Sequence, residues 1–174
     1  MILTGALLLM VTMGEGPSTQ DWVDLARYAG RWYEIARLPN RFQRQCAGDV
    51  IAIYTLRADG RVTVLNQCRK ADGTTASAEG EARRADPDGP ASRLKVRFAP
   101  GFLSFLPFVW GDYWILELDH DYRYALVGDP ARKYLWFLSR TPTMDAATYE
   151  SLTAAATRLG FDVARLERTP QSTR

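Results

Sequence analysis

Eight short stretches of the chain carry hydrophobic residues in patterns typical of β-strands, either alternating with polar residues or in runs rich in β-branched and aromatic side chains. They cover residues 30–38, 50–56, 62–68, 75–84, 93–98, 113–118, 124–128 and 134–140. Asp59-Gly60 and Asp72-Gly73 are hairpin-turn sequences between consecutive stretches. The pattern predicts an all-β fold, an eight-stranded up-and-down antiparallel barrel, because closing the sheet removes its exposed edges.

A two-sheet sandwich is the alternative architecture. It requires long connections between the sheets, and apart from residues 85–92 and 99–111 the connections in this chain are short. The barrel is therefore favoured. An eight-stranded barrel has room inside for side chains or for one small ligand, and the five Trp, eight Tyr and seven Phe of this chain are suited to lining such a cavity.

Alternation with a period of two assigns side chains to the inside or the outside of the predicted barrel. Arg97 and the two other basic residues of 93–98 are expected to face water, and Glu117 is expected to face outward. The residues assigned to the inner face are Trp32, Glu34, Ala36 and Leu38 in the first stretch, Leu94, Val96 and Phe98 in the fifth, and Trp114, Leu116 and Leu118 in the sixth.

The candidate ligand-binding residues follow from this assignment: Tyr54, Asn66, Val96, Phe98, Trp114 and Leu116. The alternative is that these side chains simply fill the barrel. Glu34 is either a buried carboxylate satisfied by local donors or a group that selects the polar head of a ligand. An apolar cavity with few polar groups suits fatty acids, lysophospholipids or sterol-like molecules.

One amphipathic helix is predicted after the last strand, over residues 144–159, with Thr143 as its N-cap. Gly160 is expected to end it in the left-handed conformation, with Phe161 packing back. Residues 167–174 are polar and are expected to form a frayed tail. The predicted apolar stripe of the helix consists of Tyr149, Leu152, Ala156 and Leu159.

The charged and metal-binding residues exclude several classes of function. The net charge is +2 without a block of Lys or Arg, which argues against nucleic acid as a partner. The single histidine, His120, lies in a predicted turn, and Cys46 and Cys68 do not have metal-ligand spacing, so neither a metal site nor another cofactor is expected. The two cysteines form either a disulfide, which export would favour, or two buried thiols.

The N-terminal segment bears on export. Residues 1–13 are mostly apolar and 14–17 interrupt the run, which indicates a signal-like segment too short to span a bilayer. No Lys or Arg precedes it and no clean cleavage site follows, so a displaced start is the alternative. No cysteine follows that could serve as a lipoprotein acylation site. We expect residues 1–20 to be this segment and a linker, 21–168 the domain and 169–174 a polar tail.

The stretch 99–110 is unusually rich in large apolar residues for a loop interrupted by Pro and Gly. It is expected to fold over the barrel as a lid, to contact a membrane or a partner, or to do both in different parts. The residues concerned are Phe102, Phe105, Phe108 and Trp110.

Three motifs resemble the signature regions of the lipocalins, and most of all the branch of bacterial lipocalins and apolipoprotein D. They are residues 30–37 (GRWYEIAR), 121–128 (DYRYALVG) and 134–142 (YLWFLSRTP), within a resemblance that spans about 21–168. The second motif departs from the family pattern, in which Thr-Asp-Tyr is frequent. The resemblance implies that Gly30, Trp32 and Arg140 are structural, with the guanidinium of Arg140 stacked on the indole of Trp32. It also implies ligand contacts for Tyr54, Asn66 and Trp114.

The resemblance implies a binding protein and not an enzyme, one that stores or transports a small hydrophobic ligand. Many bacterial relatives carry an acylated N-terminal cysteine in the outer membrane, so a periplasmic or outer-membrane location is expected here. Two alternatives remain. One is an interaction module that forms a homodimer or contacts a membrane through the aromatic loop. The other is an enzyme with Cys68 as nucleophile, although no histidine is placed to activate it.

Overall fold

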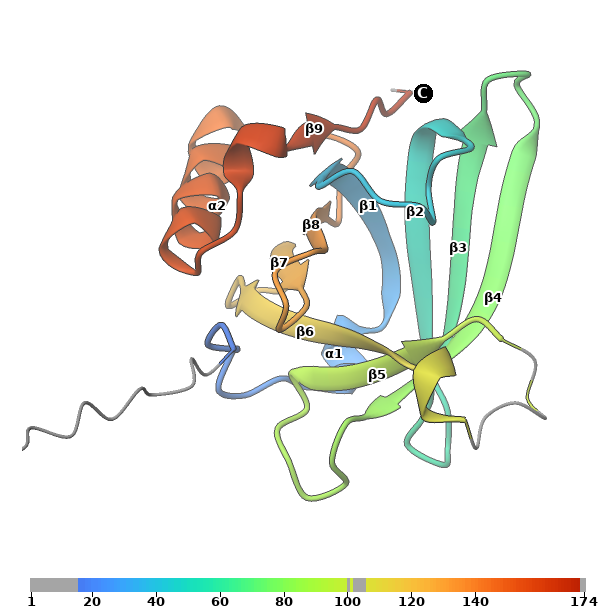
Figure 1. Ribbon diagram of the computed structural model, residues 1–174, viewed down its shortest axis with the longest axis vertical. Helices are drawn as coiled ribbons and strands as arrows, with labels where there is room; N and C mark the ends of the chain where they lie inside the picture. The colour runs from blue at the N-terminus through green and yellow to red at the C-terminus, as the bar shows by residue number, and fades with distance from the viewer. Residues whose placement is uncertain (1–15, 100, 102–105, 173–174) are drawn as a thin grey trace, which may run out of the picture.

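The computed structural model describes residues 16–99, 101 and 106–172 (Figure 1). The predicted apolar segment at residues 1–13, together with Phe102 and Phe105, lies outside the described residues. All eight predicted strands are present. They are β1 (Gly30–Arg37), β2 (Cys46–Leu56), β3 (Val62–Lys70), β4 (Thr75–Arg84), β5 (Arg93–Arg97), β6 (Gly111–Leu118), β7 (Tyr124–Gly128) and β8 (Leu135–Ser139).

The strands form one antiparallel sheet that closes on itself. Consecutive strands are neighbours from β2 to β8, and β1 then pairs with both β8 and β2. Tyr33 of β1 lies opposite Ser139 on one side and Ile51 on the other. The predicted barrel is therefore confirmed and the sandwich is wrong. Short connections favour this result because sequential antiparallel strands pair directly.

The start of β1 is covered by the short helix α1 (Leu25–Tyr28), which begins at the N-cap Asp24. Trp32 is fully buried beneath it and donates from Nε1 to the carbonyl oxygen of Tyr28 at 2.8 Å. The guanidinium carbon of Arg140 lies 3.9 Å from the centre of the Trp32 ring, which confirms the predicted contact. The three nitrogens of this guanidinium donate to the carbonyl oxygens of Tyr122, Arg31, Arg27 and Tyr28.

Helix α2 (Ala146–Arg158) packs on the outside of the barrel, at the left in Figure 1. Its N-cap is Asp145, whose carboxylate accepts a hydrogen bond from the backbone nitrogen of Thr148 at 2.9 Å, so the N-cap predicted at Thr143 is wrong. Gly160 has φ +85° and Phe161 is buried, as predicted. The apolar side of α2 covers an outer core that includes Ile35, Leu116, Leu126, Leu135, Phe137, Leu152 and Ala156.

The chain after α2 returns to the barrel, so the prediction of a frayed tail is wrong for residues 167–172. After the 3-10 helix η3 (Val163–Arg165), the two-residue strand β9 (Glu167–Arg168) pairs with the end of β1. Thr169 is buried, and Gln171 donates to the carbonyl oxygens of Glu34 and Val50. These bonds bridge β1 and β2 where the two strands stop pairing directly, so the polar tail residues satisfy backbone groups that would otherwise lack partners.

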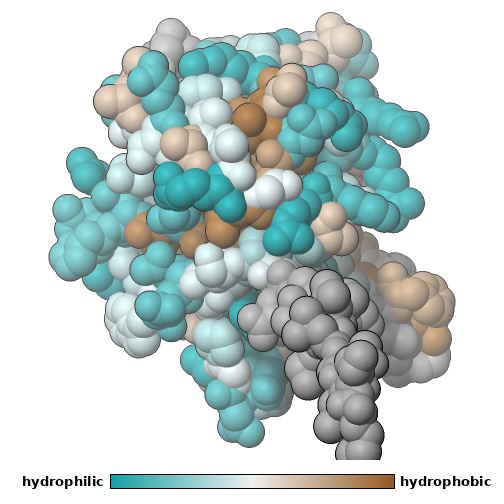
Figure 2. All heavy atoms as spheres, turned by 60° about the vertical axis from the view of Figure 1, so that its left-hand side comes forward, coloured by the Kyte–Doolittle hydropathy of each residue, from teal (hydrophilic) through white to brown (hydrophobic). Residues whose placement is uncertain are grey.

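The face that carries α2 is mostly hydrophilic, with hydrophobic residues showing in a band between hydrophilic ones (Figure 2). Within the described part of the chain, no helix combines the length and the apolar character that a membrane span requires. Among the residues that the structure describes, the most exposed large hydrophobic side chain is that of Phe108, in the 3-10 helix η2 (Pro107–Val109).

Candidate functional site

The barrel holds a cavity of about 800 Å³ with a predominantly apolar lining. Tyr28 of α1 lies at one end, which we call the floor, beside Trp32. Residues of the loops after β1, β5 and β7 line the opposite end, the mouth. Small side chains on β2 and β4 leave the interior open, and these are Ala52, Ala76, Ala78 and Ala82.

Five of the seven residues predicted to bind ligand line this cavity: Glu34, Tyr54, Asn66, Val96 and Phe98. Asn66 of β3 lies close to the small side chains of the two adjacent strands, because it is opposite Ala52 on β2 and Ala78 on β4. Phe98 packs against Gly80, where an added Cβ would lie 2.7 Å from its ring. Gly80 therefore makes room for a cavity-lining ring. Ligand contact by these residues stays a prediction.

The inward orientation predicted for Trp114 and Leu116 is wrong. Tyr113 lies opposite the inward-facing Leu94, so Trp114 points outward, and Leu116 belongs to the core beneath α2. The cause is a β-bulge in β6 between Ile115 and Glu117. A bulge places two consecutive residues against one on the next strand and interrupts the alternation. The orientation of Trp114 and Leu116 is inferred by counting back from the outward-facing Glu117, and the bulge makes that count wrong.

A second bulge, in β1 between Glu34 and Ala36, has the same consequence. Ala36 and Leu38 lie in the outer core and not inside the barrel, which corrects their predicted orientation. The expectation that Arg97 faces water is also wrong. Its residue is 8% exposed, since Trp110 lies over its guanidinium at 5.1 Å and Glu81 contacts it at 3.4 Å.

Three tyrosine hydroxyls meet at the floor and form what we call the tyrosine cluster. The hydroxyl of Tyr113 lies 2.8 Å from that of Tyr28 and 2.9 Å from that of Tyr54. Burial raises the pKa of Tyr54 to about 12 and raises the pKa of Tyr28 and of Tyr113 well above the ordinary value. All three groups are therefore neutral hydroxyls at physiological pH, each able to donate one hydrogen bond and to accept others.

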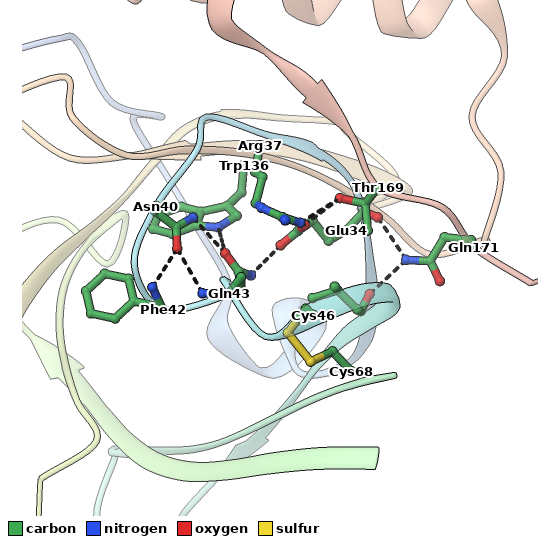
Figure 3. The surroundings of a disulfide bond; sticks show 11 residues. Glu34, Arg37, Asn40, Phe42, Gln43, Cys46, Cys68, Trp136, Thr169 and Gln171 are labelled. Atoms are coloured by element: carbon green, nitrogen blue, oxygen red, sulfur yellow. Dashed lines mark hydrogen bonds and ion pairs between the residues drawn. A yellow bond between two sulfur atoms is a disulfide. The ribbon is translucent and has the colours of Figure 1, made fainter. Parts of the chain in front are cut away.

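A second polar cluster, the Glu34 cluster, lies nearer the mouth (Figure 3). The Glu34 side chain is 2% exposed and its oxygens accept hydrogen bonds from Arg37, Gln43 and Thr169. Arg37 is three residues further along β1, Gln43 belongs to the loop after β1, and Thr169 belongs to the docked tail. One carboxylate thus joins β1, the loop that follows it, and the tail at Thr169, 135 positions further along the chain. The interpretation of Glu34 as a satisfied buried carboxylate agrees with this geometry.

Burial raises the pKa of the Glu34 carboxyl above its ordinary value of 4.5. Hydrogen bonds from Thr169, Arg37 and Gln43, and the charge of Arg37, oppose this effect by stabilising the ionised form. The net result is a group that holds its proton more tightly than an exposed glutamate.

Gln43 extends the Glu34 cluster to the rim. Its side-chain oxygen accepts hydrogen bonds from Asn40 at 2.7 Å and from Nε1 of Trp136 at 3.2 Å, as Figure 3 shows. Tyr134 stacks on Trp136 and also contacts Phe42 of the same loop. The loop of residues 38–45 is therefore held across the mouth by the side-chain amide of Gln43 and by the contact of Phe42 with the stacked rings of Tyr134 and Trp136.

Several cavity residues were missed in the sequence, among them Tyr28, Tyr113 and Trp136. Trp136 lies four positions before Arg140 in the last predicted strand, so alternation places the two on the same face. Since Arg140 was expected to contact the inward-facing Trp32, this spacing could have identified Trp136 as a cavity residue. The bulge in β6 hid Tyr113. Tyr28 lies before the first strand, where no alternation applies.

The aromatic loop contributes two described residues of the four predicted. Phe108 is 79% exposed, whereas Trp110 is half-buried between Arg83, at 4.2 Å, and Arg97. Both line the mouth of the cavity. Trp110 therefore packs on the barrel, and Phe108 projects from it.

Cys46 and Cys68 form a disulfide that links β2 to β3 beside the cavity. The alternative of two thiols is wrong, and neither sulfur is available as a nucleophile. Among residues 16–99, 101 and 106–172, no group of three or more His, Cys, Asp or Glu side chains is arranged to hold a metal ion.

Comparison with known protein families decides the assignment. The model of the lipocalin-like domain matches residues 23–171, which is most of the chain. The chain belongs to the lipocalin family. Lipocalins are known for binding and transporting small hydrophobic ligands, and the ligand-holding eight-stranded barrel is typical of the family.

Curated relatives and a solved structure agree with the assignment. Temperature-induced lipocalin-1 of Arabidopsis thaliana is 47% identical over 86% of this chain and 80% of the relative. Outer membrane lipoprotein Blc of Escherichia coli K12 is 44% identical over 88% and 82%, and rat apolipoprotein D is 34% identical over 90% and 81%. Insecticyanin of Manduca sexta has a similar fold, with a TM-score of 0.69 at 23% identity over 91% of this chain and 85% of that one.

Proposed function

We propose that this lipocalin binds a small hydrophobic ligand of the fatty-acid or lysophospholipid type and stores or transports it in the cell envelope. The observation that carries the proposal is the apolar cavity of about 800 Å³ inside the closed barrel. Cavities of this size bury most of the surface of a ligand with one long hydrocarbon chain. The similarity to the relatives named outer membrane lipoprotein supports the envelope location.

The ligand contacts that we propose are Tyr54, Asn66, Val96 and Phe98. They come from β2, β3 and β5 and from the residue that follows β5, and all line the same space. Apolar contact supplies affinity in proportion to the area removed from water, and the few polar groups fix the orientation.

The function is tested by filling the cavity. Ala52 lines it on β2, and Ala52→Trp is expected to abolish the binding of a fluorescent fatty acid. The control is Thr55→Trp on the same strand, where the side chain is exposed and the cavity is untouched. Mass spectrometry is expected to detect lipid in an organic extract of the purified wild-type protein and to find none in the extract of Ala52→Trp. Equal binding by both variants would contradict the proposal.

Peripheral membrane contact is a second part of the proposal, supported by the exposure of Phe108 beside the cavity mouth. An aromatic side chain exposed to this extent gains free energy by entering the headgroup region of a bilayer. Phe108→Ala is expected to weaken co-sedimentation with liposomes. Trp22→Ala, at another exposed aromatic residue, is the control. Liposome binding that is unaffected by Phe108→Ala would contradict the proposed membrane contact. The homodimer stays a prediction.

A further inference from the structure

The tyrosine cluster at the cavity floor has more hydrogen-bond donors than its own contacts use. Three hydroxyls contain three protons, and the cluster makes two contacts, Tyr28 to Tyr113 and Tyr113 to Tyr54. Each contact uses one proton. No further hydrogen bond joins these hydroxyls to another residue in the described part of the chain, so one proton has no protein acceptor.

A buried donor without an acceptor is costly, because the group has left water and gained nothing in return. The three rings line the cavity, and Tyr113 is only half-buried whereas Tyr28 and Tyr54 are buried. Both outer hydroxyls can donate to Tyr113, in which case its own proton is directed to the cavity. The unused donor therefore lies in reach of a ligand at the end of the cavity farthest from solvent.

The chemistry of the floor selects among acceptors. Phenols buried among rings provide hydrogen-bond donors but no positive charge. The guanidinium of Arg140 stacks on Trp32 and has its nitrogens engaged by backbone carbonyl groups, so it affects the hydroxyl of Tyr28 through its charge and not through a hydrogen bond. Bringing an ionised carboxylate to this place would cost its hydration without a cation in hydrogen-bonding contact to replace it. A neutral oxygen meets no such penalty.

We propose that the tyrosine cluster is a binding site for a neutral carbonyl oxygen, as in a ketone or an ester, at the innermost end of the ligand. The ligand then enters with its carbonyl end first and leaves its hydrocarbon chain toward the mouth. This inference rests on the proposed function, since it requires that the cavity take up a ligand, and it narrows the ligand that enters polar end first to one with a neutral carbonyl. An ionised fatty acid or a lysophospholipid would instead keep its charged end at the mouth.

The test compares two ligands that differ in one oxygen. Undecane and 2-undecanone are titrated against a neutral fluorescent probe, N-phenyl-1-naphthylamine, bound in the cavity. Burying the carbonyl costs its hydration, so the preference is measured as the ketone-to-alkane affinity ratio relative to that of a variant without the three hydroxyls. For the wild-type protein this preference is expected to be about five-fold, the value of one net hydrogen bond. The triple variant Tyr28→Phe, Tyr54→Phe, Tyr113→Phe is expected to lose this preference and to keep its affinity for undecane.

The triple variant removes all three hydroxyls together and so leaves no orphaned partner, which favours retention of the fold. The control is Tyr134→Phe, which removes a hydroxyl at the mouth and is expected to keep the preference. Decanoate, ionised at about pH 8, is expected to bind the wild type and the triple variant equally. Should the triple variant fail to fold, the three single variants replace it, and at least one must reduce the preference.

The outcomes separate this inference from the proposed function. Failure of both undecane and 2-undecanone to displace the probe would overturn the carrier function itself. A ketone-to-alkane affinity ratio that is the same in the wild type and in the triple variant would overturn the carbonyl site and leave the carrier function intact. An equal loss for decanoate and for the ketone would overturn the requirement for a neutral acceptor.

Discussion

The two polar clusters inside this barrel are built on opposite principles. Around Glu34, a charged group receives hydrogen bonds from three different segments and is almost fully shielded from solvent. At the floor, the three neutral hydroxyls of Tyr28, Tyr54 and Tyr113 bond to one another and face the cavity with a donor to spare. Both carboxylate oxygens in the first cluster are engaged by protein donors, whereas one hydroxyl proton of the second cluster has no protein acceptor in the described part of the chain.

The difference indicates how a structural polar group can be told from a binding one. A buried charge is tolerated when it is paired and hydrogen-bonded, and both carboxylate oxygens of Glu34 are engaged by protein donors. A neutral group with unused capacity is tolerated beside a cavity, because water or a ligand can complete it. We therefore assign Glu34 to holding the mouth loop and the tail, and the tyrosines to the ligand.

The largest expected effect comes from removing the support of the floor. Trp32 is fully buried, contacts the Tyr28 ring and carries the guanidinium of Arg140. Trp32→Ala is expected to lower the free energy of unfolding by about 3–5 kcal/mol, the usual cost of deleting a buried aromatic side chain. Urea denaturation measures this. A loss below about 1 kcal/mol would contradict the structural role of the indole.

Disrupting the Glu34 cluster is expected to have the next largest effect. Glu34→Leu leaves the buried ends of Arg37, Gln43 and Thr169 without their acceptor and is expected to cost about 3 kcal/mol. Glu34→Gln keeps the shape and an acceptor oxygen, and serves as the matched control with a smaller loss. Equal stability of Glu34→Leu and the wild type in urea would show that the cluster does not hold the mouth loop.

The smallest effect is a pH dependence that belongs to Glu34 alone. Because its pKa in the folded protein is raised above the ordinary 4.5, the folded state binds the proton more tightly than the unfolded state. Stability contributed by this group therefore rises as the pH falls through the folded pKa toward 4.5. Wild-type unfolding free energy, measured relative to Glu34→Gln, is expected to increase over that interval.

Other carboxyl groups do not obscure this measurement. The pKa values of Asp49, Asp119 and Asp145 are lowered from 3.8, chiefly by hydrogen bonds that stabilise the carboxylate. The stability that these three groups contribute is present above their ordinary pKa and is lost as the pH falls through their lower pKa in the folded protein. It is the same in the wild type and in Glu34→Gln and cancels in the difference. A difference that stays flat with pH would contradict the raised pKa.

Much of the fold could be predicted from local patterns. Eight strands, the outer helix, its glycine terminus and the Trp32–Arg140 contact were all expected, because alternation, turn residues and the family motifs are each contained in a few consecutive residues. Five of the seven expected ligand residues line the cavity for the same reason. The errors at Trp114, Leu116, Ala36 and Leu38 share one cause, since each adjoins a bulge.

The sequence by itself determined that this chain forms a closed barrel with an apolar interior, since period-two hydrophobicity and short turns leave few other ways to bury the same residues. Only the tertiary structure decided which polar groups are satisfied. A bulge changes the face of every residue on one side of it, and the partners of Glu34 and of the three tyrosines come from segments up to 135 positions apart. Hydrogen bonds over such separations depend on how strands are brought together, which no local pattern records.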